Sequence, residues 1–167
     1  AKDFLLFFIA LELMTLSLYI LAAYSGSLPS IEAGLKYLVL GSLASAFLLY
    51  GISLLYAASG TLSFEELGDF AAQNIEAGRP LPLLFLAGAL LVLSALGFKV
   101  ASVPFQVWVP DVYEGAPTPV TAFFSVASKS AGFAALARIL FEILGSLENE
   151  RRVLFSLFAA MTLLYGN

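Results

Sequence analysis

Lys99 lies inside a long hydrophobic run and is followed five residues later by Pro104. A charged residue at the centre of a bilayer costs about 2.5–3.5 kcal/mol on insertion scales. Pro104 cannot donate a hydrogen bond to the carbonyl of Val100 and its ring clashes there, so a helix should break close to Lys99. Broken helices occur at membrane depth only where the freed backbone faces protein or water. A charge and a break this close together predict a pathway for ions or protons.

Two more charged residues, Glu12 and Lys129, lie far from the ends of their apolar runs. Ionisable residues deep in a membrane are functional by default, so both are candidates for the same pathway. Residues three, four and seven positions apart share a helix face, which places Thr15 and Tyr19 beside Glu12. That face therefore carries a carboxylate and two hydroxyl groups.

Polar residues also surround the expected break. Gln106 is placed to hydrogen-bond water there, and Pro110 begins a rigid segment at the mouth of the pathway. Thr121 and Ser125 are spaced by four residues, and Lys129 follows at the same spacing, which predicts a polar stripe running inward along one helix face.

The alternative is that each of these charges is structural, either paired and silent or placed near a helix end. Lys36 and Arg138 lie within reach of an interface, where long side chains extend their charge to water. Lys36 nevertheless stays a pathway candidate. Trp108 and Tyr113 are typical of the aromatic belt at a membrane surface, and they could also line a channel.

Composition limits the chemistry. Of the 167 residues 60% are hydrophobic and 12% charged, with a mean hydropathy of +0.94. Soluble domains carry about 25% charged residues, so the composition indicates a membrane protein. The sequence has no cysteine and no histidine, which excludes thiol chemistry and removes the commonest metal ligand and proton shuttle. Proton chemistry must then use Lys, Glu, Asp, Tyr and water, and the net charge of −4 excludes a nucleic-acid footprint.

The hydrophobic periodicity predicts an all-α polytopic membrane protein, a bundle of about five transmembrane helices in a single domain. The expected spans cover residues 4–24, 31–56, 82–109 with a break at Pro104, 118–144 and an incomplete 153–167, and residues 59–81 form a polar connection with a short helix. Small residues four positions apart, at Gly41 and Ser45 and at Ser42 and Ala46, favour close helix packing. Since the last run is too short to cross about 30 Å of hydrocarbon and no signal peptide appears, we expect an internal piece of a larger protein.

Local signals predict how these elements begin and end. Ser30 is expected to cap the second span, and the segment Ser63–Glu66 fits the capping-box pattern of the short helix. The segment 110–119 is expected to be a rigid loop because it contains three prolines. Arg138 and Glu142 are four residues apart and are expected to pair.

The run FKVASVPFQVWVPDVYEGAPTPVTAFFSVASKSAGFAALARI, residues 98–139, resembles the signature of the antiporter-like membrane subunits of respiratory complex I. It is most similar to the subunit N (chain 2) family of NADH–quinone oxidoreductases. The segments LELMTLSLYIL around Glu12 and EAGLKYLVLGSLASAFLLYGISLLY from Glu32 agree with this family. The resemblance covers nearly the whole chain and implies a fragment of a larger subunit built from inverted repeats.

The resemblance implies roles for four residues. Glu12 matches the family's glutamate in the fifth helix, Lys99 the lysine of its broken seventh helix and Lys129 the central lysine of the eighth. Lys36 matches a lysine early in the sixth helix. Gln106 departs from the pattern, because many relatives carry histidine there, which removes a titratable step at the mouth of the break.

The resemblance also implies a proton-translocating subunit with no redox centre, cofactor or metal of its own. NADH, FMN, iron–sulfur clusters and quinone would be held by other subunits of the complex. The implied partners are other membrane subunits, including antiporter-like ones, and lipid, water and protons. The implied location is the inner (plasma) membrane of a cell, or an organellar energy-transducing membrane. The positive-inside rule would place on the cytoplasmic side the end of the bundle that carries Arg79, Arg151 and Arg152. The resemblance instead places the segment 110–119, at the other end, on that side, and we follow the resemblance.

A mechanism follows as a hypothesis. Burial favours the neutral amine of Lys99, whereas a carboxylate within about 4–6 Å favours the ammonium form. Glu12 would then act as a movable counter-charge, and Lys99 would pass its proton through water to Lys129. Two alternatives remain open: a subunit of a related cation/proton antiporter or membrane-bound hydrogenase, or a helix-packing scaffold whose buried charges only fix the register.

Overall fold

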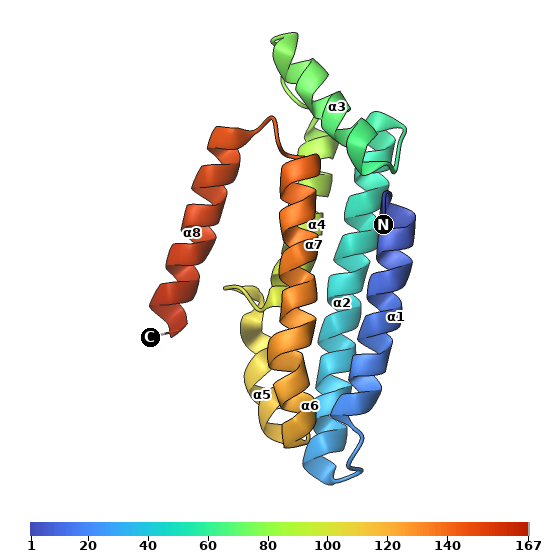
Figure 1. Ribbon diagram of the computed structural model, residues 1–167, viewed down its shortest axis with the longest axis vertical. Helices are drawn as coiled ribbons and strands as arrows, with labels where there is room; N and C mark the ends of the chain where they lie inside the picture. Colours follow the sequence, from blue (N-terminus) through green and yellow to red (C-terminus); the bar gives the residue numbers. More distant parts are fainter. Residues whose placement is uncertain (167) are drawn as a thin grey trace.

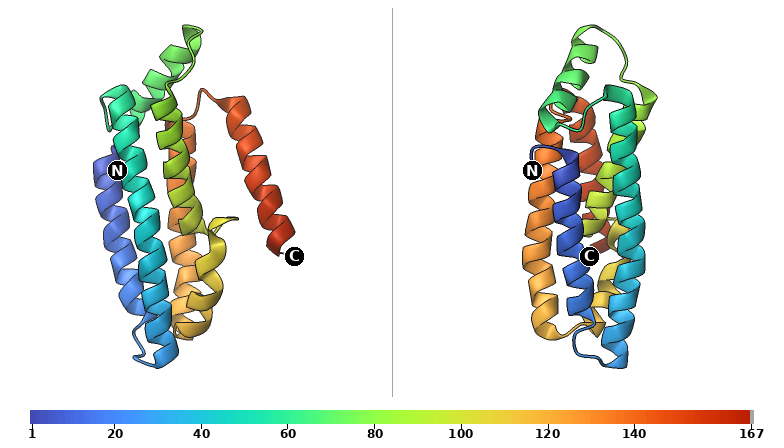
Figure 2. Two further views of the ribbon diagram at one scale, coloured as in Figure 1. Left: turned by 180° about the vertical axis from the view of Figure 1, so that it is seen from behind. Right: turned by 90° about the vertical axis from the view of Figure 1, so that its right-hand side faces the viewer.

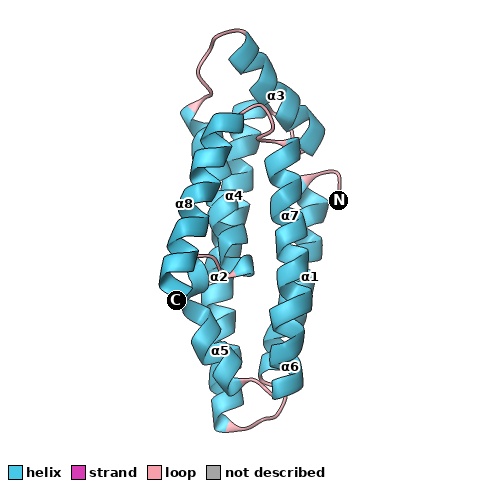
Figure 3. Ribbon diagram, turned by 60° about the vertical axis from the view of Figure 1, so that its left-hand side comes forward, coloured by secondary structure: helices cyan, strands magenta, loops and turns pink. Residues whose placement is uncertain are grey.

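The computed structural model describes residues 1–166, apart from the side chain of Glu150, and every regular element in that range is a helix (Figures 1 and 3). The elements in chain order are α1 Phe4–Ala22, α2 Leu28–Ser59, α3 Phe64–Glu76, α4 Leu83–Val100, η1 Phe105–Trp108, α5 Val109–Gly115, α6 Thr118–Phe123, η2 Phe124–Ser128, α7 Lys129–Glu142 and α8 Glu148–Gly166. One isolated bridge pairs Asp3 with Ser63. The predicted all-α fold is confirmed.

Four helical stretches are long and apolar enough to cross a membrane. They cover Phe4–Ala22, Leu28–Ser59, Leu83–Gly115 and Thr118–Glu142. In Figure 1 they run side by side along the long axis, as expected for a multi-pass membrane bundle. Within residues 1–166, α8 does not meet the same criteria, and Figure 2 shows its free end standing away from the other helices.

Two clusters of buried apolar side chains fill the bundle. One lies toward α3 and includes Phe64, Leu67 and Leu96. The other lies toward α5 and includes Phe98 and Trp108. Because Leu96 and Phe98 belong to different clusters, the last turn of α4 lies where the two clusters meet.

The first turn of α2 differs from the expected capping. Ser27 precedes the helix and its hydroxyl accepts a hydrogen bond from the backbone N–H of Ser30, at 3.4 Å. Pro29 lies within the first turn, where its missing N–H costs nothing. Ser30 is fully buried and donates to the carbonyl of Ala22, at 2.6 Å. The prediction of a cap at Ser30 was wrong, since its hydroxyl joins the end of α1 to the start of α2.

The capping box predicted at Ser63 is also absent from the described start of α3. Ser63 precedes the helix, but its side chain makes no capping hydrogen bond. The hydroxyl of Thr61 contacts the Glu66 carboxylate instead, and it accepts the backbone N–H of Ser63 at 3.1 Å. A residue two positions earlier therefore engages Glu66 in place of Ser63.

The helix break begins before Pro104. α4 ends at Val100, Ala101 has a left-handed φ of 59°, and the N–H of Ser102 bonds to the carbonyl of Gly97 at 2.9 Å. Since a residue before proline is disfavoured in the helical conformation, the helix must end ahead of Val103. The freed N–H of Val103 donates to the hydroxyl of Thr162 on α8, at 3.2 Å.

The chain after the break is helical rather than an open loop. Pro110 lies in the first turn of α5, where a proline is tolerated. Only Ala116 and Pro117 separate α5 from α6. The expectation of a rigid loop over 110–119 was therefore wrong except at Ala116 and Pro117.

Trp108 is 2% exposed and donates its indole N–H to the carbonyl of Phe98, at 2.9 Å. It is thus a core residue that joins the two sides of the break, and the belt interpretation was wrong for it. The last carbonyl groups of a helix lack the N–H group four residues later that they would bond within the helix. The indole N–H of Trp108 binds one of these carbonyl groups at the end of α4.

Small residues permit two close helix contacts. A Cβ atom at Gly41 would overlap the ring of Tyr19 on α1. A Cβ atom at Gly51 would lie 2.8 Å from the carbonyl oxygen of Gly88, and one at Gly88 would lie 2.8 Å from that of Gly51. Gly41 thus permits the close contact predicted for it, whereas Ser42 and Ala46 lie on the exposed side of α2.

The crossing of α2 and α4 should therefore tolerate no added side chain. We expect Gly88→Ala to lower the free energy of unfolding by about 1–3 kcal/mol, because backbone atoms, which cannot rotate away, are the first obstacle. Thermal unfolding of the purified full-length protein in detergent measures this. The control is Ala46→Val, which adds carbon atoms on the exposed side of α2. Equal stability of the two variants would contradict a close backbone contact between α2 and α4.

Candidate functional site: a buried lysine at a helix break

Lys99 lies in the last turn of α4 and is 4% exposed. Its Nζ donates a hydrogen bond to the hydroxyl of Thr15 on α1. Thr15 is fully buried, and its own hydroxyl donates to the carbonyl of Leu11 at 2.6 Å. The predicted pathway lysine is therefore buried, directly before the break, with an oxygen acceptor supplied by a neighbouring helix.

Glu12 is half-buried on the same helix as Thr15. Its carboxylate accepts a hydrogen bond from the hydroxyl of Ser45 on α2, at 2.5 Å. Among the ion pairs of the described residues, none joins Lys99 to Glu12. Glu12 nevertheless lies three residues before Thr15, so it shares the face of α1 that Lys99 contacts. The two charges are thus electrostatic neighbours, each bound to a hydroxyl group.

Lys129 opens α7 directly after the π-helical turn η2. Its Nζ lies 5.6 Å from the centre of the Tyr113 ring on α5, an arrangement that attracts a cation to the aromatic face. Ser128 beside it is buried. Turns of this kind are frequent at functional sites in helices.

The π turn interrupts the polar stripe expected ahead of Lys129. Ser125 lies on the exposed side and donates to the carbonyl of Ala122 at 2.8 Å. Thr121 is half-buried, and its hydroxyl lies 3.3 Å from the carbonyl of Tyr113. The structure therefore brings Ser128, rather than Ser125, to the buried side next to Lys129.

Three buried polar atoms have no hydrogen-bond partner among the described residues: Tyr19 Oη, Gln106 Oε1 and Tyr113 Oη. Buried polar groups are almost always satisfied, by protein or by ordered water. Gln106 lies in η1, just after the break, and Tyr113 lies beside Lys129. These atoms mark positions where water would be hydrogen-bonded.

Aromatic side chains connect these groups. The Tyr19 and Tyr37 rings meet edge to face at 4.8 Å, and Tyr37 stacks on Trp108 at 4.6 Å with an interplanar angle of 10°. Trp108 meets Tyr113 edge to face at 6.0 Å. The set extends from Tyr19, one turn after Thr15 on α1, to Tyr113 beside Lys129. It holds α1, α2 and the two short helices after the break in a fixed arrangement.

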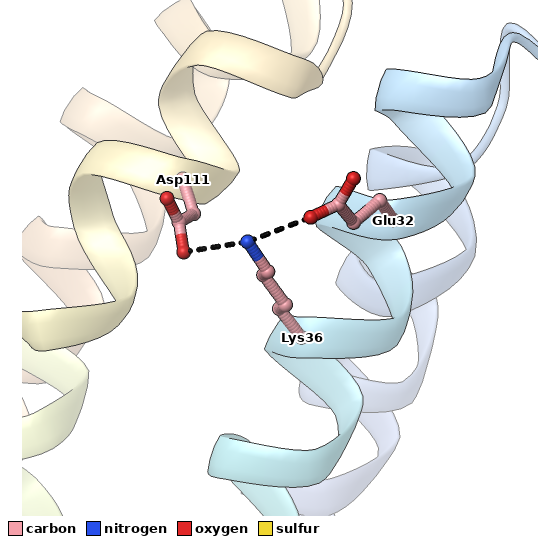
Figure 4. Close-up of polar contacts among 3 residues, drawn as sticks. All are labelled: Glu32, Lys36 and Asp111. Atoms are coloured by element: carbon pink, nitrogen blue, oxygen red, sulfur yellow. Dashed lines mark ion pairs between the residues drawn. The ribbon is translucent and has the colours of Figure 1, made fainter.

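Lys36 lies near the end of the bundle that carries α5, between two carboxylates (Figure 4). Its Nζ is 2.8 Å from Glu32 Oε1 on its own helix and 2.9 Å from Asp111 Oδ2 on α5. The Lys36 side chain is 42% exposed and borders a cavity of about 230 Å³ that Glu114 also lines. The ion pair with Asp111 joins α2 to the segment that follows the break.

Replacing Lys36 should separate a positional role from proton exchange. On the proton-pathway hypothesis of the sequence analysis, we expect Lys36→Met to lower the rate of proton translocation by the assembled protein up to about fivefold, because α5 loses its ionic link to α2 in a partly exposed site. Lys36→Arg keeps both ion pairs and should pump near the wild-type rate. If Lys36→Arg were as impaired as Lys36→Met, an exchangeable proton on Lys36 itself would be required instead.

At the opposite end of the bundle, the pair predicted between Arg138 and Glu142 is confirmed, with Nε 2.8 Å from Oε1. The side chains are 40% and 39% exposed.

Within residues 1–166, no group of three or more acidic side chains is arranged to hold a metal ion. Of the three charges predicted for the pathway, Lys99 is buried, and Glu12 and Lys129 are half-buried.

Residues 1–167 match the family model described as NADH:quinone oxidoreductase/Mrp antiporter, transmembrane. The chain belongs to this family. It is similar to NADH-quinone oxidoreductase subunit N of Desulforamulus reducens, with 45% identity over 168 residues that cover 100% of the chain and 34% of that protein. It thus spans about a third of the length of this curated relative.

Two solved structures of this family's architecture are similar over most of the chain. One is the membrane-bound sulfane sulfur reductase, an archaeal respiratory membrane complex, with a TM-score of 0.82 and 33% identity over 96% of this chain and 31% of that one. The other is respiratory complex I from Thermus thermophilus with bound aureothin, with a TM-score of 0.70 and 42% identity over 83% of this chain and 29% of that one. Both matches are with subunits of multisubunit membrane complexes.

Proposed function

We propose that this chain is part of a proton-translocating membrane subunit of an NADH:quinone oxidoreductase. The observation that carries the proposal is Lys99, a buried amine in the last turn of a broken helix, which contacts the face of α1 that also carries Glu12. A scaffold would not need a buried cation at the position where the helix opens. The 45% identity to a subunit N over the whole chain supports the same assignment.

The proton step uses the balance between burial and charge. A buried ammonium group is costly, and a nearby carboxylate offsets that cost. When the Glu12 carboxylate approaches, Lys99 takes up a proton. When Glu12 moves away toward α2, the ammonium is less stabilised and Lys99 releases the proton. Two unit charges 4 Å apart interact by about 1 kcal/mol in bulk water and by about 4 kcal/mol near a protein surface. A small displacement of the Glu12 carboxylate is therefore sufficient to change the protonation of Lys99.

The route before and after Lys99 follows the polar atoms of the site. Water enters at the break, hydrogen-bonded to Gln106, from the α5 end of the bundle, which faces the cytoplasm or its organellar equivalent. Pro104 keeps this segment from closing into a continuous helix. Lys129 receives the proton through water, next to the Tyr113 hydroxyl. The ion pairs of Lys36 with Glu32 and Asp111 fix the position of α5 where water enters. Pro110, Thr121 and Ser125 line the same entrance.

Oxidation of NADH and reduction of quinone take place in other subunits of the complex, which hold FMN and the iron–sulfur clusters. This chain contributes translocation, and its partners are other membrane subunits, including antiporter-like ones. The subunit is a multi-pass protein of the inner (plasma) membrane or of an organellar energy-transducing membrane. Coupling reaches Lys99 through the position of the Glu12 charge.

A second candidate function stays within the family. The similarity to the sulfane sulfur reductase complex, with a TM-score of 0.82, favours a subunit of a related respiratory complex, and the family description, which includes the Mrp antiporter, favours a cation/proton antiporter. Purification of the full-length subunit from its own membranes, with its partner proteins identified by mass spectrometry, decides between the two. The proposal expects NADH-oxidising and quinone-reducing subunits in the preparation. A preparation that contains only antiporter subunits would contradict it.

The scaffold alternative is tested in the same purified complex. A scaffold predicts that variants of the buried charges fail to assemble and that whatever assembles keeps its specific activity. The proposal predicts the reverse, assembled complexes that do not pump.

A further inference from the structure

The two opposite charges of the site are each bound to a hydroxyl group from a different helix. Lys99 donates to Thr15 on α1, and Glu12 accepts from Ser45 on α2. Glu12 and Thr15 are three residues apart and share a helix face. An ion pair between Lys99 and Glu12 would thus need only a side-chain movement, yet in the structure the hydroxyl groups occupy both partners.

The hydrogen bonds of Thr15 fix the direction of its contact with Lys99. Its hydroxyl proton is already donated to the carbonyl of Leu11 at 2.6 Å, inside a fully buried site. The oxygen can therefore only accept from Lys99. An acceptor stabilises the protonated amine, which has three N–H donors and no lone pair to offer.

Ser45 has the complementary role. Its hydroxyl donates to Glu12 Oε1 at 2.5 Å, the short distance typical of a hydroxyl bound to a charged carboxylate. A donor stabilises the carboxylate form. The other described serines of α2 donate to backbone carbonyls. Ser42, Ser53 and Ser59 each donate to the carbonyl four residues earlier on their own helix, and Ser30 donates to that of Ala22 at the end of α1. Ser45 is the one that reaches across to a charge on α1.

We propose that Thr15 and Ser45 are positioning residues that hold the charges of Lys99 and Glu12 apart. This inference rests on the proposed function. Each hydroxyl replaces only part of the stabilisation that one charge would otherwise obtain from the other, because a neutral hydroxyl group stabilises a charge less than an opposite charge does. The separated state is then close in free energy to the ion-paired state, and Lys99 can alternate between them during turnover. Without either hydroxyl, the ion pair becomes the only well-stabilised arrangement, and the Lys99 proton is held.

Single substitutions in the full-length subunit of the assembled complex test this. We expect Ser45→Ala and Thr15→Val each to lower NADH-driven proton uptake into inverted membrane vesicles about tenfold, since hydrogen bonds to charged groups are the strong ones. Ser45→Thr and Thr15→Ser keep the hydroxyl and should pump near the wild-type rate. A structure of the assembled Ser45→Ala complex by electron cryomicroscopy should show Lys99 Nζ within 4 Å of a Glu12 oxygen.

Matched controls come from the same helices. Ser53 on α2 and Ser17 on α1 are exposed and donate only to their own helix backbone, at 2.9 Å and 3.0 Å. Ser53→Ala and Ser17→Ala should leave the rate unchanged. If Ser45→Ala and Thr15→Val pumped as these controls do, in a complex that Lys99→Met inactivates, the hydroxyl groups would have no such role while the proposed function stood. Normal pumping by Lys99→Met would instead overturn the proposed function.

Discussion

Replacing Lys99 by methionine is expected to lower NADH-driven proton pumping of the assembled complex by about 100-fold or more. The methionine side chain is of similar length and suits the buried site, but it carries no exchangeable proton, and loss of a positioned acid–base group typically costs about 10²–10⁴-fold. Quinone reduction coupled to pumping should fall with it. Proton uptake into inverted vesicles and the NADH-oxidation rate of the same preparation measure both effects.

The matched control for this variant is Lys2→Met, which removes a lysine from an exposed position outside α1. Assembly is checked by the amount of intact complex recovered from the membrane. Wild-type pumping by an assembled Lys99→Met complex would contradict a proton step at Lys99. Loss of assembly with unchanged specific activity would favour the scaffold.

Glu12→Gln is expected to lower pumping at least about tenfold. Glutamine has nearly the same shape and still accepts the Ser45 hydrogen bond, but it removes a charge worth about 1–4 kcal/mol to a cation 4 Å away. Lys99 then takes up a proton less readily from the α5 end. The rate of proton uptake in inverted vesicles reports this directly.

Glu76→Gln is the control, because Glu76 is exposed at the end of α3. Glu12→Asp keeps the charge on a shorter side chain, so it should retain more activity than Glu12→Gln. Equal loss in the aspartate and glutamine variants would assign the effect to packing and contradict a role for the charge.

The features that sequence predicts best here are those set by local chemistry. The apolar run around Lys99 predicts its burial, and Pro104 predicts a break beside it, because both follow from residues a few positions apart. Arg138 and Glu142 are one helical turn apart, and their pair follows from that spacing. The position of Thr15 beside Glu12 was predicted in the same way, from their spacing of three residues on one helix.

The features that sequence does not predict depend on how distant segments meet. Ser45 lies 33 residues from Glu12, and nothing local distinguishes it from the other serines of α2. Asp111 contacts Lys36 only because Val109–Gly115 is helical, which three nearby prolines argued against. The π turn before Lys129 has no clear sequence signal, and Ser125 lies within it on the exposed side.

The central claim is that a proton passes from Lys99 to Lys129 through water. The most direct test is a structure of the assembled wild-type complex by electron cryomicroscopy, at a resolution that shows ordered water. We expect water hydrogen-bonded to Gln106 Oε1 and Tyr113 Oη, in a continuous chain from the break past Lys99 to Lys129. A dry, apolar barrier between the two lysines in every resolved state would contradict it.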